Sequence, residues 1–401
     1  MKLSRRSFLQ ASALGGAMSL APKLVFSAVA ASPKDVIVVI FQRGAMDGLQ
    51  AVVPYGDADY YKLRPTIGIP DTGTGAVLPL DGFFGLNPAL APILPLYNSG
   101  QLAAVHATGI KSGSRSHFQC QDTIERAYLS VGGSPSGWLN RHTDSVGLGS
   151  TFQAVGIASG LQMSLRGPAP SIGMQSIASF TVSTNSKRKT QLEDTLYDLY
   201  SAGSKLGVNA RRALDATDYL ALANPTQYLT ANGAVYPTTT FGSQMFQVAQ
   251  LIKAGVGLQM ACVDIGGWDH HDDINTDLPP LLDELSKSLL AFHTDLGTAM
   301  SGVTVLVMTE FGRRAGENGS LGTDHGTGSS MLLMGGGVVG GHVYTDWPGL
   351  APAKLYQGDL DVTTDIRTVM SELLVKRGQE SNLAAVFPGF VPGPYLGCFA
   401  S

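Results

Sequence analysis

Runs of apolar, β-branched residues alternate along the chain with segments that have helical spacing. Residues 35–41 read Asp-Val-Ile-Val-Val-Ile-Phe, a continuous apolar run typical of a strand that is buried on both faces of a parallel sheet. Shorter runs of the same kind predict further strands at 102–106, 152–157, 259–264, 303–308 and 331–334.

Helical spacing separates these predicted strands. It covers residues 87–97, 118–129, 241–258, 278–300 and 362–376. Such alternation is typical of an α/β fold, in which helices cover a mostly parallel sheet and functional residues gather at the carboxyl ends of the strands. We therefore predict a three-layer α/β sandwich with a central, mostly parallel sheet.

Two further segments depart from the alternation. Between 191 and 223 the spacing is helical and no strand interrupts it, which predicts a helical insertion at about 190–235. The tail from Phe387 is rich in proline and glycine and is expected to run over the surface. We expect residues 31–401 to form a single domain.

The first 30 residues have the order of an export signal. The run 4–10, Ser-Arg-Arg-Ser-Phe-Leu-Gln, resembles the twin-arginine motif, and residues 11–20 are moderately apolar. The triplet 28–30, Ala-Val-Ala, offers a cleavage site. The sequence thus predicts export by the twin-arginine machinery to the periplasm or beyond. The apolar stretch is too short for a stable membrane span, and we expect none in the mature chain.

Composition excludes some classes of protein. The 401 residues carry only 14% charged side chains and a net charge of -4, so the chain lacks the excess of positive charge with which proteins bind nucleic acids. Three cysteines, an odd number, cannot define a disulfide framework. Cys262 lies in an apolar run and is expected to be buried, while a bridge between Cys120 and Cys398 is left open.

The first polar motif follows the first predicted strand directly. Residues 42–49 place Asp47 between glycines, where its carboxylate could hold a cation. An ordinary Asp-Gly turn explains the same residues without any chemistry, and on this motif alone we favour the turn.

The second motif precedes the predicted helix at 118–129. Arg115, Ser116 and His117 stand in sequence there. A hydroxyl at a helix start lies where backbone N–H groups stabilise an anion, which suits a nucleophile in phosphoryl or sulfuryl transfer. The alternative is simple capping of the helix by Ser116.

The third motif is the densest in polar groups. Residues 264–273 hold four carboxylates and two imidazoles after a predicted strand, and Asp269 and His271 lie within it. Aspartate and neutral histidine suit zinc, iron or manganese, so we favour metal binding over a solvated loop.

The fourth motif surrounds the next strand. Glu310 and Arg313 follow that strand, and Asp324 and His325 stand between glycines before the following one. We expect these groups to meet at the same sheet edge and to bind metal or an oxyanion, with Arg313 and Arg314 available to the oxyanion. The alternative is an ion pair at Glu310 and a loop cap at His325.

These motifs, in this order, resemble a bacterial exported family called domain of unknown function 1501. The resemblance rests on Gly266-Gly267-Trp268-Asp269, on 309–313 and on 323–326, and it covers essentially the whole mature chain. That family is similar to the alkaline phosphatase and sulfatase superfamily. The resemblance therefore implies an alkaline-phosphatase-like fold with a metal site at the carboxyl edge of the sheet.

The superfamily pattern also implies roles for individual residues. Asp269, His271 and His325 would hold a principal metal, and Ser116, with Ser114 as competitor, would be the nucleophile. Asp47 and Glu310 would hold a second metal or bridge the two, and Asp324, beside His325, is a further candidate ligand. Glu310-Phe311 stands where the pattern has Asp-His, which removes one imidazole from the second site.

The sequence thus predicts an exported hydrolase of phosphate or sulfate esters that uses a divalent metal: zinc, calcium, manganese or iron. Arg115, His117 and Arg313 would assist at the transferring group, and the substrate would be a small molecule or a carbohydrate-linked ester. The competing hypothesis is a non-catalytic exported binding or assembly protein that has kept the fold.

Overall fold

The computed structural model describes residues 35–129, 134–147, 149–181, 188–201, 205–223 and 227–400. The predicted export signal at 1–30 lies outside the described residues. Lys34–Ser401 forms one compact unit, which contains all the described helices and strands. Among these helices, none is both long and apolar enough to span a bilayer.

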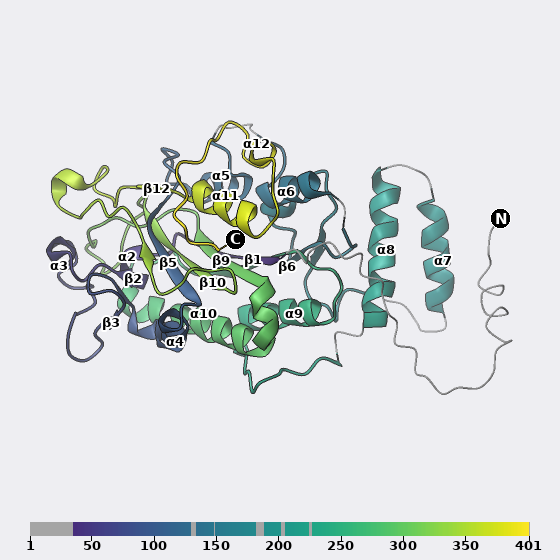
Figure 1. Ribbon diagram of the computed structural model, residues 1–401, viewed down its shortest axis with the longest axis horizontal. Helices are drawn as coiled ribbons and strands as arrows, with labels where there is room; N and C mark the ends of the chain where they lie inside the picture. The colour runs from purple at the N-terminus through teal and green to yellow at the C-terminus, as the bar shows by residue number, and fades with distance from the viewer. Residues whose placement is uncertain are drawn as a thin grey trace. The chain divides into compact units, whose positions relative to one another are not determined.

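A nine-stranded sheet forms the centre of this unit (Figure 1), in the order β11-β5-β10-β9-β1-β8-β6-β7, with β12 paired to β5. The strands β9, β1, β8, β6 and β7 run parallel to one another in this order, while β10 is antiparallel to both β9 and β5. The bounds are β1 Val36–Arg43, β5 Leu102–Gly109, β6 Ala154–Ile157, β7 Ile172–Met174, β8 Met260–Gly266, β9 Val303–Thr309, β10 Ser329–Gly335, β11 Val343–Tyr344 and β12 Thr364–Asp365.

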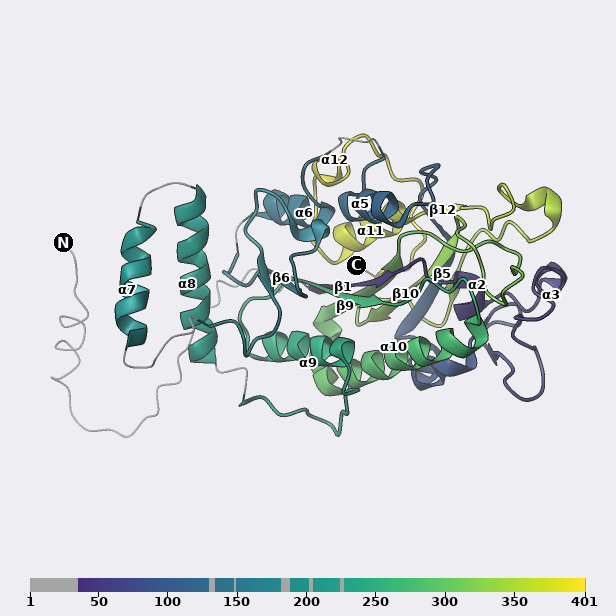
Figure 2. The ribbon, with the colours of Figure 1, turned by 180° about the vertical axis from the view of Figure 1, so that it is seen from behind.

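Helices cover both faces of the sheet, as Figures 1 and 2 show. On one face α9 and α10 pack against alternate residues of β1, among them Val38 and Ile40. On the other face Ile37 and Val39 pack with α6 and α11. Because side chains of a strand alternate between faces, the continuous apolar run of β1 supplies both cores. The helix bounds are α5 His117–Arg126, α6 Trp138–Val146, α9 Thr240–Lys253, α10 Ile274–Leu296, α11 Ile366–Lys376 and α12 Leu383–Val386.

Smaller elements complete the unit. Two helices, α7 (Lys189–Leu199) and α8 (Lys205–Ala223), lie in the segment for which a helical insertion was predicted. A three-stranded sheet has the order β2-β4-β3, with bounds Val52–Val53, Gly85–Leu86 and Leu78–Pro79. The remaining helices are α2 Gly48–Ala51, α3 Ala58–Leu63, α4 Leu94–Asn98 and the 3-10 turns η1 Pro88–Ile93, η2 Met163–Leu165, η5 Gly297–Gly302 and η6 Pro352–Lys354.

The predicted α/β architecture is confirmed: the sheet is mostly parallel and has helices on both sides. The strand β10 was predicted, but its antiparallel direction was not. No helix lies between β9 and β10, and a parallel neighbour needs a crossover, so the chain turns back alongside β9.

The helix α6 was not predicted, because many of its buried residues are polar. Asn140, Arg141, His142 and Thr143 are all buried, as is Trp138. A search for apolar residues at helical spacing does not detect a helix whose buried positions carry polar side chains.

Two expectations about the C-terminal part and the cysteines need correction. The tail does not simply run over the surface, because Cys398 and Phe399 are buried against the core on the α11 side of the sheet. The bridge between Cys120 and Cys398 that the sequence left open is not formed, and all three cysteines are free and buried. Burial raises the pKa of the Cys262 thiol, as expected for an inert core residue.

Candidate metal centre

Four side chains meet at the carboxyl edge of the sheet: His117, His271, His325 and Asp269, which we call the imidazole cluster. His117 is the first residue of α5. Asp269 and His271 lie in the loop after β8, and His325 lies between β9 and β10. Three separate motifs of the sequence therefore contribute to one place, which is the location expected for a site in an α/β sheet.

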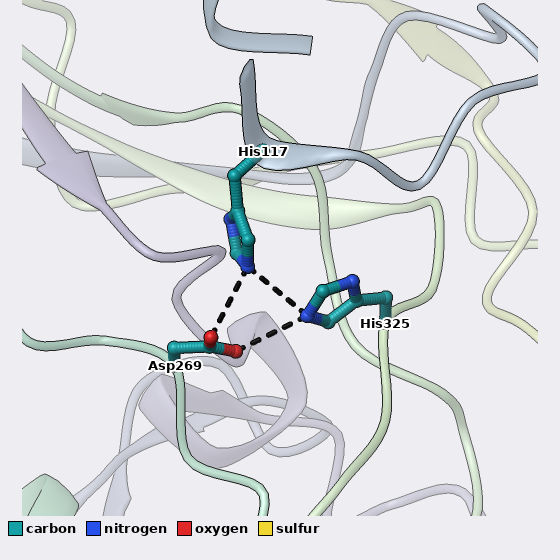
Figure 3. Close-up of side chains that lie close together, drawn as sticks. All are labelled: His117, Asp269 and His325. Atoms are coloured by element: carbon teal, nitrogen blue, oxygen red, sulfur yellow. Dashed lines mark hydrogen bonds and ion pairs between the residues drawn. The ribbon is translucent and has the colours of Figure 1, made fainter. Parts of the chain in front are cut away.

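The distances within the cluster are short (Figure 3). His117 Nε2 lies 3.0 Å from His325 Nε2 and 3.3 Å from Asp269 Oδ2. His325 Nε2 lies 3.1 Å from Asp269 Oδ1. Ligand atoms of these three residues all lie within 4.8 Å of one another. Two nitrogens bound to one zinc ion at about 2.0 Å each are separated by about 3 Å, so this spacing fits a shared ion.

His271 adjoins the same point. Its Nε2 lies 3.0 Å from His325 Nε2 and 3.0 Å from Asp269 Oδ1. The side chains of His271 and Asp269 are 45% and 46% exposed, whereas that of His117 is 22% exposed. The cluster is therefore open on the His271 side and enclosed on the His117 side, an arrangement that leaves access for a further ligand.

The Nδ1 atom of each imidazole is engaged on the outer side of the cluster. It lies 2.8 Å from Glu310 Oε1 in His117, 2.8 Å from the Arg115 carbonyl in His325, and 3.1 Å from Asp324 Oδ1 in His271. A carboxylate or carbonyl oxygen accepts, so each Nδ1 donates. When Nε2 carries no proton, its lone pair faces the cluster, where Nε2 of His325 lies 3.0 Å from Nε2 of both His117 and His271. Three inward-facing nitrogens beside a carboxylate fit a bound cation.

Asp269 is held as an anion in this arrangement. Burial alone would raise the pKa of Asp269, but the hydrogen bond and positive charge of Arg313 outweigh it, and the pKa falls to about 2. Arg313 Nη2 lies 2.5 Å from Asp269 Oδ1. Asp324 behaves similarly, because its hydrogen bond with His271 lowers the pKa of the carboxyl group.

The loop after β8 approaches the end of β1 closely enough to require a glycine. Gly44 has a φ of +123°, and a Cβ at this position would lie 2.8 Å from the backbone nitrogen of Asp269. Only glycine tolerates both conditions. The Gly44 carbonyl also accepts a hydrogen bond of 2.7 Å from Arg313, which joins the two loops behind Asp269.

Several sequence predictions are altered by this geometry. Asp47 does not join the cluster: its carboxylate caps α2 and pairs with the buried Arg64 at 3.0 Å, so its oxygens are already satisfied. Arg313 does not face an oxyanion, because its side chain is fully buried and donates to the carbonyls of Ala45 and Thr323. An arginine enclosed in this way positions loops and cannot touch a substrate.

Glu310 is also placed differently from its predicted role as a metal ligand. Its side chain is fully buried, and Oε1 accepts from Gly44 N–H at 2.9 Å and from Gln121 Nε2 at 2.9 Å, besides His117. Glu310 and Asp324 therefore lie one layer outside the cluster, where they orient imidazoles. His117, predicted as a catalytic group, lies among the candidate ligands instead.

Sequence reasoning missed Gln121. This residue lies four positions after His117 on α5, so both side chains project from the same face of the helix. A polar residue at that spacing is the one signal in the sequence that could have revealed it.

The predicted nucleophile and its neighbour lie at the start of α5. Ser116 occupies the N-cap position, but its side chain makes no capping hydrogen bond. The hydroxyl of Ser114, by contrast, donates to Gln119 at 2.7 Å and accepts from the Ser116 N–H at 3.2 Å. Arg115 is partly exposed and pairs with the buried Asp359 at 2.5 Å.

Comparison with known proteins places the chain in a family. No curated protein matches it. Among solved structures, it is similar to alkaline phosphatase from the Antarctic bacterium TAB5, with 12% sequence identity, a TM-score of 0.28, and coverage of 76% of this chain and 92% of that chain. A likeness at that level carries no argument about activity. Residues 99–377 match a family model described as "Protein of unknown function (DUF1501)", and the chain therefore belongs to the DUF1501 family.

Proposed function

We propose that this protein is a metal-dependent hydrolase of phosphate or sulfate esters, exported by the twin-arginine route to the periplasm or beyond. The observation that carries the proposal is the orientation of three imidazoles. His117, His271 and His325 each have Nδ1 bonded outward and Nε2 turned toward Asp269. Such an arrangement is typical of a built metal site and unusual for ordinary surface histidines.

The donor set favours a borderline divalent ion. Imidazole nitrogens with a single carboxylate suit zinc, iron or manganese better than calcium, which prefers oxygen ligands. Such an ion would supply Lewis-acid polarisation of the ester oxygens. The chain itself would orient the ester through the open side of the cluster, where His271 and Asp269 are exposed.

Ser116 is the proposed nucleophile. Its hydroxyl makes no capping bond within α5, and it directly precedes the candidate ligand His117. Backbone N–H groups of the first helical turn would stabilise the negative charge that develops on the transferred group. The nearby guanidinium of Arg115 is partly exposed and could bind an ester oxygen while it remains paired with Asp359.

A panel of phosphate and sulfate esters tests the proposal. We expect turnover by the wild-type protein, loss of both bound metal and turnover in His271→Ala, and loss of turnover with retained metal in Ser116→Ala. Ser114→Ala is the matched control and should retain activity. Activity that survives in Ser116→Ala and disappears in Ser114→Ala would reassign the nucleophile.

One observation favours a second candidate, a non-catalytic exported binding protein that holds a single metal. Asp47 and Glu310, which the superfamily pattern would use at a second metal, are occupied by Arg64 and by three donors, respectively. If no ester in the panel is hydrolysed while metal is bound, this second candidate replaces the first.

A further inference from the structure

A cleft of about 550 Å³ lies beside the imidazole cluster at the carboxyl edge of the sheet. Arg43, the last residue of β1, and Asp264, near the end of β8, both line it. These two strands pair in parallel. The opposite walls come from α5 and from residues 158–163, which follow β6. Crevices above the carboxyl ends of parallel strands are where open α/β sheets bind ligands.

The side chain of Gln121 connects this cleft to the cluster. Gln121 lines the cleft, and its Nε2 donates to Glu310, the residue that orients His117. Its Oε1 accepts from Arg43 at 3.3 Å. The helix α5 thus contributes His117 to the cluster and the next residues to the cleft wall, so one ligand could reach both.

The cleft is highly polar but carries no net charge. Three arginines and three acids line it (Arg43, Arg126, Arg166, Asp122, Glu125 and Asp264), in a chain with only 14% charged residues. Arg43 pairs with Glu125 at 3.1 Å and with Asp264 at 2.9 Å, and Arg126 pairs with Asp122 at 2.7 Å. Arg166 forms no ion pair with a described residue, and its Nε donates to the Leu161 carbonyl at 2.7 Å. Because the acids balance the arginines in number, the cleft offers many hydrogen-bond donors and acceptors but no excess of positive charge to an anionic ligand.

An aromatic ring stands at the same cleft. Phe118 lines it and is 89% exposed. In the described part of the chain, the only other exposed aromatic side chain is Tyr395, at 38%. A flat apolar ring next to hydrogen-bonding groups matches a ligand that has one apolar face and a rim of hydroxyl groups.

We propose that this cleft binds an uncharged carbohydrate moiety, with Phe118 against the apolar face of a sugar ring and the paired charges bonded to its hydroxyl groups. The inference rests on the proposed function, since the sugar would be the part of the ester that carries the phosphate or sulfate to the imidazole cluster. The cleft thereby selects the sugar, and the imidazole cluster acts on the phosphate or sulfate ester that the sugar bears.

The test is binding of neutral oligosaccharides to the full chain. The probes are α- and β-linked glucans, mannans and galactans, with sulfated and phosphorylated forms of the same sugars as a second set. Binding is measured by saturation-transfer NMR and by calorimetry, with metal-loaded and with chelator-treated protein. We expect one class to bind in both states, to bind about tenfold more weakly to Phe118→Ala, and to be retained by Phe118→Tyr. Leu229→Ala is the matched control, since Leu229 is 84% exposed and does not line the cleft.

The outcomes separate this inference from the proposed function. Binding to no neutral oligosaccharide, or binding that Phe118→Ala leaves unchanged, would overturn the assignment of the cleft. Binding confined to sulfated or phosphorylated sugars on metal-loaded protein would overturn it as well and leave the hydrolase standing. Neutral-sugar binding by a protein that takes up no divalent metal, even when titrated with it, would support the cleft and overturn the hydrolase.

Discussion

At the scale of the residue, the hydrogen-bond partner of each imidazole Nδ1 decides whether Nε2 of the same ring is free to bind a metal. Glu310 accepts from His117 Nδ1 in a fully buried position, so it fixes both the tautomer and the angle of the ring. Partners of this kind contribute strongly to metal affinity even though they do not touch the ion.

Glu310→Gln should therefore weaken metal binding by about 10- to 100-fold. A neutral amide is a poorer acceptor for His117 and cannot serve Gly44 and Gln121 equally well. Titration of metal-free protein with zinc measures the effect. Asp272→Asn, an exposed acid in the loop that carries His271, is the control. Equal affinities for the two variants would exclude a role for Glu310 at the metal.

Residue types alone predicted part of the cluster. Asp269, His271 and His325 stand out because polar groups are concentrated after apolar strands, and the structure brings all three together. Asp47 shows the same pattern, but its partner Arg64 lies 17 residues further along the chain. A pattern around one motif cannot reveal a distant counter-ion, so the sequence could not separate a ligand from a buried ion pair.

At the scale of the element, the site depends on loops that approach one another very closely. A Cβ on Gly326 would lie 2.3 Å from the backbone of Arg313, next to His325. Gly326→Ala should push apart the two ends of the loop between β9 and β10, move His325 away from Asp269 and reduce metal affinity at least about tenfold. Gly319→Ala in the same loop is the control, because its added Cβ meets nothing within 4 Å. Unchanged affinity in Gly326→Ala would contradict the close packing.

The end of α10 gives a pH-dependent prediction. Asp295 is buried and accepts from Tyr236 at 3.0 Å, from Ala231 N–H at 2.8 Å and from Tyr228 and Lys253. Burial alone would raise the pKa of Asp295, but these donors lower it. A lowered pKa stabilises the fold above the ordinary value of about 3.9, and that stabilisation is lost as the pH falls further.

Asp295→Asn should therefore lower the free energy of unfolding by about 3 kcal/mol at pH 6, with a smaller difference from the wild type at pH 3. Urea unfolding at the two pH values measures this. Asp283→Asn, on the same helix, removes a surface pair with Lys287 and should cost less than about 1 kcal/mol. If Asp295→Asn lowers the free energy of unfolding as much at pH 3 as at pH 6, the lowered pKa of Asp295 would be contradicted.

Long elements were predictable and short ones were not. The sequence alone reveals the apolar runs of β1 and β9 and the helical spacing of α10, because each pattern repeats over several residues. The two-residue edge strands β11 and β12 exist only because β5 offers them hydrogen bonds. A tertiary contact of this kind leaves no local pattern.

At the scale of the whole molecule, the twin-arginine pair predicts where the protein works. Replacing Arg5 and Arg6 together with lysine should retain the precursor inside the cell, because the export machinery reads the arginine pair. Fractionation and N-terminal sequencing would show the wild-type mature chain beginning at Ala31. Lys2→Arg, which keeps the charge and the pair, should be exported normally. Export of the double-lysine variant would contradict this route.

The central claim is that His117, His271, His325 and Asp269 hold a metal. The most direct measurement is the metal content of the exported protein, purified without chelator and analysed by mass spectrometry of the elements. We predict about one equivalent of zinc, iron or manganese in the wild type and almost none in His117→Ala, with the fold retained by circular dichroism. Folded wild-type protein that contains no bound divalent metal would contradict the claim.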